Sequence, residues 1–308
     1  MAAIVASALF MQNLDASVVA TVLPAMARDL AVDPVHLSVA ITSYLVALCV
    51  FIPVSGWVAD RYGARRVFML AIVVFTTASA LVGLSQGLAS LVAARVLQGV
   101  GGAMMVPVGR LLLLRRVSKE ELVVAMTWLT MPGLLGPVLG PPVGGLLTDA
   151  FSWRAVFWLN IPVGMLGLVL VWLFIPDVEK QDPGPLDAKG LTLWGAALAC
   201  GMAGLETVGR GIAPAWFAPL MLGIAVVSTL LAVRHSRRAA RPAVDLSLLR
   251  LPSFGVSMGG GSLFRVGAST LPFLLPLKLQ IVFGLSASAS GLITFATALG
   301  AFAMKPLV

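Results

Sequence analysis

Four ionisable side chains lie inside long apolar runs of this 308-residue sequence: Asp15, Arg95, Glu206 and Arg265. A charge near the centre of a bilayer costs at least about 2.5–3.5 kcal/mol, so such residues usually face a protein interior or a watery cavity and have a function there. All four are therefore candidates for a proton-coupling site or cavity. Desolvation and a nearby cation act on a buried carboxyl group in opposite directions, which suits a group that takes up and releases protons. We assign this role to Asp15, in the segment LDASVVATVLP.

Each of these residues also has a structural interpretation. Asp15 could form a permanent ion pair with Arg95 or Arg265, and Arg95 could be a plain tether between helices. Glu206 lies close to the end of its run with Arg210 one turn away, which favours an ion pair at the membrane interface. Arg265 has no acidic neighbour in sequence, so its partner must come from another helix or from water.

A second candidate for function is the turn GWVADRYGARRVF, Gly56 to Phe68, between two long apolar runs. Its three arginines cannot lie in hydrocarbon, so the turn faces water, and the excess of cations places that water in the cytoplasm. Its glycines permit a tight reversal and the close approach of helices. A generic positively charged loop would explain the arginines but not their spacing. The residues that define the spacing are Gly56, Asp60, Arg61, Gly63, Arg65 and Arg66.

The segment GLLGPVLGPPVGG, Gly133 to Gly145, combines prolines and glycines inside one apolar run. Proline removes a backbone donor and kinks a helix, and freed carbonyl groups are tolerated in lipid only where protein or cavity water satisfies them. We expect this helix to pack inward and to bend, and a purely structural kink is the alternative. The candidate residues are Gly136, Pro137, Gly140, Pro141, Gly144 and Gly145.

The composition excludes a water-soluble globule, because 59% of the residues are apolar, 11% are charged and the mean hydropathy is +1.00. A net charge of +8 could suggest a nucleic-acid partner, but the cations gather in short loops between apolar runs, as they do in multispan proteins that meet anionic lipid. The sequence contains no HExxH motif, no phosphate-binding P-loop and no zinc spacing. We therefore predict neither an enzyme nor an ATP-driven pump, and no metal or cofactor.

Ten runs are long enough to cross a bilayer, whose core needs about 20 apolar residues per helix. They lie at 3–26, 38–59, 67–85, 88–109, 121–147, 154–175, 190–209, 214–233, 254–279 and 287–308. Because cations collect on the cytoplasmic side, their distribution predicts a multi-pass protein of the cytoplasmic membrane with its N-terminus in the cytoplasm. Of the 21 Lys and Arg residues, the loops on the opposite side hold only Arg28, Arg154, Arg210 and Lys278.

Five motifs, in order along the chain, resemble the major facilitator superfamily and specifically its fourteen-span drug:proton antiporter group. The turn at Gly56–Phe68 is similar to the loop between the second and third helices, and Gly133–Gly145 is similar to the fifth-helix pattern of exporters. Ala20 departs from the first-helix motif, which commonly has asparagine there. The other three motifs comprise Leu14, Asp15, Ser17 and Pro24; Leu91, Arg95, Gln98, Gly99, Gly101 and Ala103; and Trp153, Arg154, Phe157, Asn160 and Pro162.

The resemblance implies an all-α integral membrane fold of two six-helix bundles, with about ten of an expected fourteen transmembrane helices present in a C-terminally truncated chain. Residues 1–175 would be the N-terminal bundle. Residues 176–250 would be a cytoplasmic linker with two extra helices and a basic loop, and 251–308 the incomplete start of the C-terminal bundle. The first, fourth and ninth spans would line a central cavity that brings Asp15, Arg95 and Arg265 together. Asp60 and its neighbouring arginines would clasp the two halves and so gate the cavity.

The resemblance also implies a function. We expect proton-driven export of small amphipathic or cationic compounds such as drugs. Proton-coupled import of a nutrient or metabolite is the alternative, and the fifth-helix pattern argues against it. The expected partners are the substrate, protons and membrane lipid. An accessory periplasmic protein is compatible with the sequence, but no residue pattern indicates one.

Overall fold

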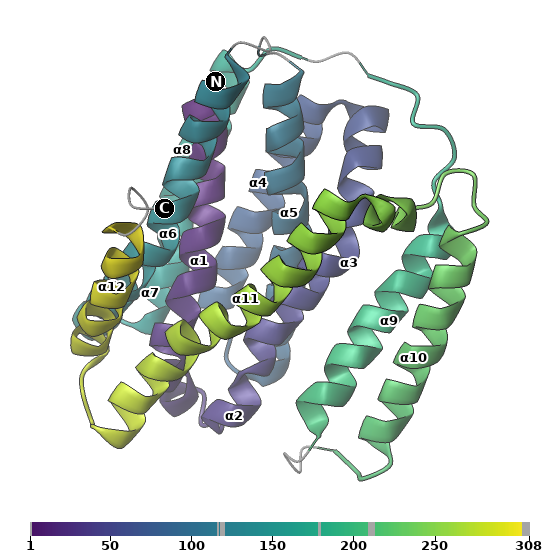
Figure 1. Cartoon of the computed structure of the whole chain (residues 1–308). Helices are drawn as coiled ribbons and strands as arrows, with labels where there is room; N and C mark the ends of the chain where they lie inside the picture. Colours follow the sequence, from purple (N-terminus) through teal and green to yellow (C-terminus); the bar gives the residue numbers. More distant parts are fainter. Residues whose placement is uncertain (1, 116, 118–120, 178–179, 209–212, 304–308) are drawn as a thin grey trace.

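The computed structural model describes residues 2–115, 117, 121–177, 180–208 and 213–303, except for the side chains of some helical residues, Arg265 among them. Helices dominate the described residues (Figure 1). Six of them are long and apolar enough to cross a membrane. The helices are α1 (Ala2–Asp29), α2 (Pro34–Leu37), α3 (Val39–Tyr62), α4 (Ala64–Gly83), α5 (Leu88–Leu114), α6 (Leu122–Ala150), α7 (Trp153–Trp158), α8 (Asn160–Phe174), α9 (Ala188–Thr207), α10 (Phe217–Ser236), α11 (Pro252–Leu277) and α12 (Ala287–Ala303).

Each of the ten predicted spans coincides with one of these helices or with a pair of consecutive ones. The second predicted span, 38–59, lies in α3, which α2 precedes across Ser38, and the sixth comprises α7 and α8, which meet at Leu159. Residues 304–308 of the tenth predicted span lie outside the described residues. A five-residue 3₁₀-helix, Leu246–Arg250, precedes α11, and a π-helical turn, Lys278–Val282, follows it. The all-helical membrane architecture expected from the apolar runs is therefore confirmed.

Side-chain caps explain where several helices begin. The side chain of Asp33 accepts a hydrogen bond of 2.7 Å from Val35 N, and Pro34 occupies the first position of α2. Ser152 accepts from Arg154 N at 3.3 Å at the start of α7. Such caps satisfy backbone N–H groups that have no partner within the helix.

The turn between α3 and α4 is shorter than predicted. Residue 63 alone separates the two helices, and Gly63 has φ +95°, a conformation that side-chain-bearing residues rarely adopt. Arg65 therefore lies in the first turn of α4 rather than in a loop. The structure does not show the predicted close approach of another helix at Gly56. A Cβ added to this residue would have no neighbouring heavy atom within 4 Å among the described residues. Gly63 provides the reversal, and Gly56 lies within α3.

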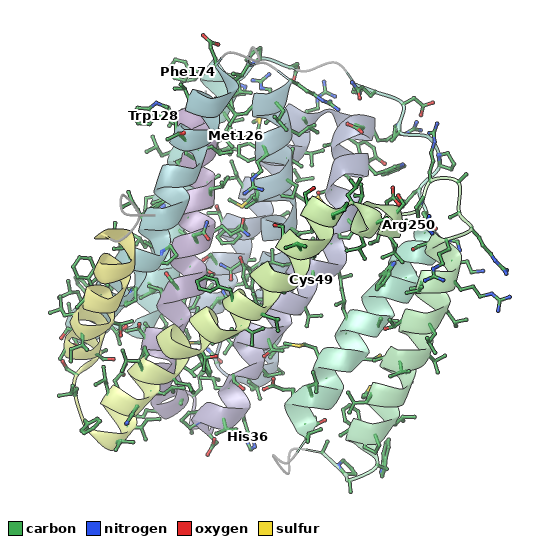
Figure 2. All side chains as sticks on the ribbon, viewed as in Figure 1. His36, Cys49, Met126, Trp128, Phe174 and Arg250 are labelled. Carbon is green, nitrogen blue, oxygen red and sulfur yellow. The ribbon has the colours of Figure 1, made fainter. Side chains whose placement is uncertain are left out.

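The first eight helices surround two hydrophobic clusters of buried residues, one of which includes Met11, Phe68 and Phe75 while the other includes Leu23 and Phe157. Helix α9 packs against α3, and α10 packs against α9 (Figure 1). Helix α11 contacts α1, and α12 packs along α6. Apolar side chains such as Trp128 and Phe174 cover the outside of the helices, as expected for a surface that meets lipid (Figure 2).

Candidate functional site

Asp15 and Arg95 form a buried ion pair between α1 and α5. Arg95 Nη1 lies 2.7 Å from Asp15 Oδ2, and each residue is 1% exposed. Arg95 Nε also donates to the carbonyl oxygen of Ala40 at 3.2 Å, and its guanidinium carbon lies 4.4 Å from the centre of the Tyr44 ring. The sequence left open whether Asp15 pairs with Arg95 or with Arg265, and in this conformation Asp15 pairs with Arg95.

Two amide side chains complete the coordination of the Asp15 carboxylate. Gln98, one turn after Arg95 on α5, donates to Asp15 Oδ1 at 2.9 Å and accepts from Arg95 Nη1 at 2.6 Å. Asn160, at the start of α8, donates to the same carboxylate oxygen at 3.1 Å. Ser79 of α4 accepts from Gln98 at 3.2 Å and from Asn160 at 2.8 Å. We call these five side chains, Asp15, Ser79, Arg95, Gln98 and Asn160, the Asp15 network.

Sequence reasoning identified the charged members of this network but did not assign a site role to Gln98, Asn160 or Ser79. The two amides carry the signal that could have revealed them, since each lies in an apolar run where an amide needs a partner. In a low-dielectric interior such groups are costly unless every donor and acceptor is satisfied. The carboxylate of Asp15 joins α1 to α5 and α8, and Ser79 of α4 enters the Asp15 network through Gln98 and Asn160.

The chemistry available to the Asp15 network is a change of charge. With Asp15 ionised, its carboxylate accepts hydrogen bonds from three donors and balances the guanidinium of Arg95. Protonation would remove that balance and leave Arg95 as an unpaired buried cation, and such an uncompensated charge costs several kcal/mol. The charges of Asp15 and Arg95 are therefore balanced against each other within the Asp15 network.

The other two intramembrane candidates do not join this network in the described residues. Arg265 belongs to α11, and its side chain lies outside the described part. Glu206 of α9 instead accepts hydrogen bonds from Ser38 at 2.6 Å and from Thr42 at 3.1 Å. Arg210, its predicted partner, is also outside the described residues. Glu206 thus belongs to a separate location between α9 and α3.

Asp60 and Arg65 tie the α3–α4 turn to neighbouring segments. Arg115, just after α5, lies 2.5 Å from Asp60 Oδ1 and donates to Gln181 at 3.1 Å. Arg65 donates to the carbonyl oxygen of Trp172 at 2.6 Å and pairs with Asp177 at 3.5 Å. These partners come from α5, α8 and the segment after α8, so the predicted clasp between the two halves stays a prediction. The remaining cations of the turn, Arg61 and Arg66, are exposed.

The glycines of α6 allow this helix to lie directly against α1. A Cβ added at Gly136 would lie 2.8 Å from Leu14 N, and one at Gly144 would lie 2.8 Å from Val18 Cγ2. One at Gly140, between them, would collide with Ser17 Oγ. Three glycines at intervals of four residues therefore share one face of α6, as in small-residue packing between membrane helices.

The same segment of α6 meets α12 on another face. A Cβ at Gly145 would collide with the carbonyl oxygen of Ala287, and one at Gly291 would collide with that of Pro141. Pro137, by contrast, is exposed. The prediction of inward packing is confirmed for Gly136, Gly140, Pro141, Gly144 and Gly145, which are buried.

Comparison with known proteins finds that the Major Facilitator Superfamily matches residues 5–308. The chain is 42% identical over 310 residues to a protein of Klebsiella pneumoniae subsp. pneumoniae and 41% identical over 309 residues to one of Escherichia coli O6:H1. Both carry the name "Putative multidrug resistance protein MdtD". The match covers 99% of this chain and 64% of each relative, so the chain spans about two thirds of their length.

Among solved structures, the fold is similar to that of the peptide transporter POT in complex with sulfate, with a TM-score of 0.68 and 16% sequence identity. A mutant of POT in complex with alafosfalin gives a TM-score of 0.69 at the same identity. Each alignment covers 99% of this chain and 66% of the solved one. At this level of identity the likeness concerns the fold alone.

Proposed function

Because the chain belongs to the Major Facilitator Superfamily, we propose that the whole protein exports small amphipathic or cationic compounds in exchange for protons. The observation that carries this proposal is the ionisable carboxylate of Asp15, buried and bound by Arg95, Gln98 and Asn160. The names of the relatives as multidrug resistance proteins support the substrate class. A superfamily of transporters also accords with the absence of any enzyme motif from the sequence.

In this proposal the Asp15 network couples proton binding to the orientation of the transport cavity. Protonation of Asp15 breaks its ion pair with Arg95, and the helices that the carboxylate joins rearrange. Substrate binding and protonation favour opposite orientations, so each proton that enters is exchanged for substrate that leaves. When the exported compound is uncharged, one elementary charge that crosses 100 mV releases about 2.3 kcal/mol, which supports a substrate gradient of roughly 40-fold. When the compound is a monovalent cation, its exchange for one proton is electroneutral, so the pH gradient alone drives efflux.

The proposal includes an arrangement in the membrane. Residues 1–175 form the first bundle, 176–250 the linker with the α9–α10 hairpin, and 251–308 the beginning of the second bundle. The N-terminus lies in the cytoplasm, and the protein resides in the cytoplasmic membrane. The cation-rich turn at Arg61, Arg65 and Arg66 supports this orientation, because cytoplasmic loops carry an excess of Lys and Arg.

The test is proton-driven uptake of a cationic dye into everted membrane vesicles that contain the full-length protein. We expect Asp15→Asn, which keeps the shape of the side chain but cannot bind a proton, to abolish uptake driven by a pH gradient. Asp182→Asn, in the exposed segment before α9, is the matched control and should leave transport unchanged. Unchanged transport in Asp15→Asn would refute the role of the carboxylate, and accumulation of substrate in intact cells would establish an importer instead.

A further inference from the structure

Two side-chain hydrogen bonds tie α11 and α12, the proposed beginning of the second bundle, to the first bundle. Asp149 of α6 accepts from Ser288 N of α12 at 2.8 Å, and Gln280, in the π-helical turn after α11, donates to the carbonyl oxygen of Thr21 in α1 at 2.8 Å. Both bonds lie beside the connection between α11 and α12, at the end of the helices where α2 lies (Figure 1). In the proposed topology this is the outer end of the protein.

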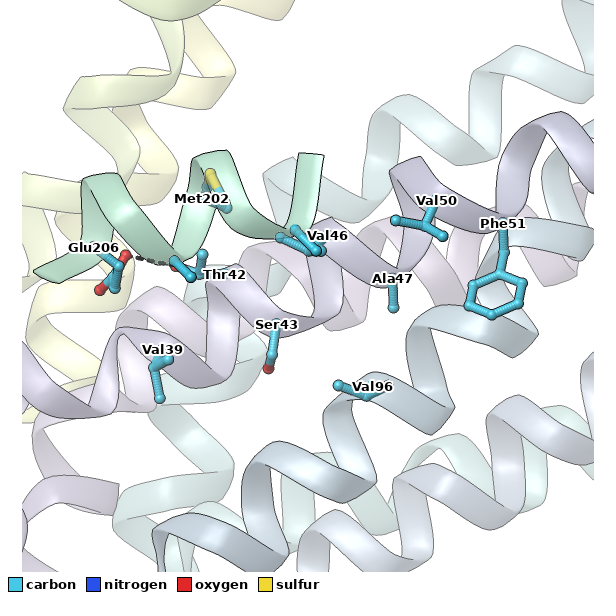
Figure 3. A pocket seen from close by; sticks show the side chains of 12 residues that line it. Val39, Thr42, Ser43, Val46, Ala47, Val50, Phe51, Val96, Met202 and Glu206 are labelled. Carbon is cyan, nitrogen blue, oxygen red and sulfur yellow. Dashed lines mark hydrogen bonds between the residues drawn. The ribbon is translucent and has the colours of Figure 1, made fainter. Parts of the chain in front are cut away.

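Another contact at this end belongs to the α9–α10 hairpin. Glu206 of α9 accepts a hydrogen bond of 3.1 Å from Thr42 of α3, which Figure 3 shows beside a cavity of about 300 Å³ that both helices line. The hairpin thus has its own attachment to the first bundle. The bonds of Asp149 and Gln280 instead join the two parts that move relative to each other when a transport cavity changes its orientation.

Helix α11 meets the first bundle along its second half. Phe273 and Leu277 pack against one of the two buried hydrophobic clusters. Nearer the start of α11, a Cβ added at any residue of Gly259–Gly261 would find no atom within 4 Å in the described part of the chain. Among the described residues, α11 and the first bundle therefore converge at the outer end and diverge toward the opposite end (Figure 1).

Asp149 completes the N-terminus of α12. Ser288 is the second residue of this helix, and Ser286, just before the helix, accepts from Ala289 N at 3.1 Å. The first N–H groups of a helix have no partner within it, and the partial positive charge at this terminus favours a nearby carboxylate. Here the carboxylate comes from another helix, 139 residues away in sequence.

The bond between Asp149 and Ser288 depends on a close approach of two backbones. Gly145 lies one turn before Asp149 on α6, and a Cβ added there would collide with the carbonyl oxygen of Ala287. An aspartate side chain is short and cannot follow a departing helix. A movement of α12 away from α6 by more than about 1 Å therefore breaks the hydrogen bond.

We propose that Asp149 is a positioning residue that favours the conformation in which the outer ends of the two bundles lie together. The inference deepens the proposed function and rests on it for the two bundles and their orientation. The carboxylate of Asp149 meets the N-terminus of α12 in the closed conformation, whereas both groups are hydrated when the outer ends separate. The contact thus shifts the equilibrium between the two orientations of the cavity without touching the Asp15 network.

The test measures the distance between spin labels on Leu84→Cys and Phe283→Cys by pulsed electron paramagnetic resonance. Both residues are exposed and lie at the outer end, one in each bundle. The full-length protein, without other cysteines, is held in nanodiscs without substrate. Asp149→Ala should raise the ratio of long to short distances by about fivefold, which is the typical effect of one lost helix cap on an equilibrium constant. Asp149→Asn keeps a neutral acceptor and should give a smaller increase.

Asp29→Ala is the matched control. It removes a carboxylate at the same end, but the partners of Asp29, Trp153 and Arg154, belong to the first bundle. This variant should leave the distribution of distances unchanged. In Asp149→Ala the short-distance peak should keep its position, because the closed conformation persists and only its population falls.

The outcomes separate this inference from the proposed transport mechanism, because the distances are measured without a pH gradient. A fivefold shift in Asp149→Ala supports the role of Asp149 even if proton-driven uptake fails in vesicles. An unchanged distribution in Asp149→Ala overturns that role even if uptake succeeds. An equal shift in Asp29→Ala, or a broad distribution that lacks the short-distance peak, would show a merely structural role and would also overturn it.

Discussion

At the scale of single residues, the pairing of Asp15 with Arg95 has a measurable consequence for stability. Removal of one partner from a buried ion pair leaves an uncompensated charge, which typically costs about 3–5 kcal/mol. We therefore expect Arg95→Met to lower the apparent melting temperature of the detergent-solubilised protein strongly. The double variant Asp15→Asn and Arg95→Met removes both charges and should be more stable than Arg95→Met alone. Additive losses in the double variant would contradict direct coupling of the two side chains.

Asp187 shows a second residue-scale effect, outside the membrane spans. It caps α9, accepting from Gly190 N at 2.9 Å and from Ala243 N at 3.0 Å, and His235 Nε2 lies 2.7 Å from Oδ1. Burial by itself would raise the pKa of Asp187, but these hydrogen bonds together lower it below its ordinary value of 3.8. The carboxylate thus holds the start of α9, the end of α10 and the loop after α10 together.

The lowered pKa of Asp187 predicts how stability depends on pH. Because the folded protein binds this proton more weakly than the unfolded chain does, the stabilisation is complete above the unfolded pKa and is lost as pH falls through the folded pKa. We expect the difference in melting temperature between the parent and Asp187→Asn to shrink as the pH falls from about 5 to below about 4. A difference that does not change across this range would show that ionisation of Asp187 contributes nothing.

At the scale of helices, alanine substitutions of Gly56 and Gly63 compare a glycine within α3 with the glycine of the α3–α4 turn. Gly63 has φ +95°, so Gly63→Ala places a side chain in a strained backbone conformation at a cost of about 1–2 kcal/mol. Gly56 lies within α3 with no atom near an added Cβ in the described residues, so Gly56→Ala should stabilise the helix by about 0.5–1 kcal/mol. Thermal unfolding of both variants measures the contrast. Equal effects would show that the reversal does not depend on the conformation of Gly63.

Helix positions could be predicted from the sequence better than helix partners. The ten apolar runs coincide with helices because the thickness of a bilayer sets their length. The start of α4 was missed because the cations Arg65 and Arg66 were assigned to a loop, whereas one glycine suffices for the reversal. Asn160 and Asp15 are 145 residues apart in the sequence, and their hydrogen bond depends on how the helices pack. A hydropathy pattern contains no information about that packing.

At the scale of the whole molecule, the orientation in the membrane can be tested directly. His36 and Arg250 lie toward opposite ends of the helices (Figure 2). In a background without Cys49 and Cys200, we expect His36→Cys to react with a membrane-impermeant maleimide in intact cells. Arg250→Cys should react only after the membrane is permeabilised, because cation-rich loops face the cytoplasm. The reverse pattern of labelling would invert the proposed topology.

The glycine faces of α6 have a mechanical consequence. On one side α6 touches α1 through Gly136, Gly140 and Gly144, and on the other it touches α12 through Gly145 and Pro141. Contacts made largely by backbone atoms have no long side chains that could change rotamer and absorb a displacement. A shift of α12 must therefore be transmitted through α6 to α1, or the contact must open. Helix α6 therefore lies directly against both α1 and α12, so a displacement of α12 acts on the backbone of α6 rather than on flexible side chains.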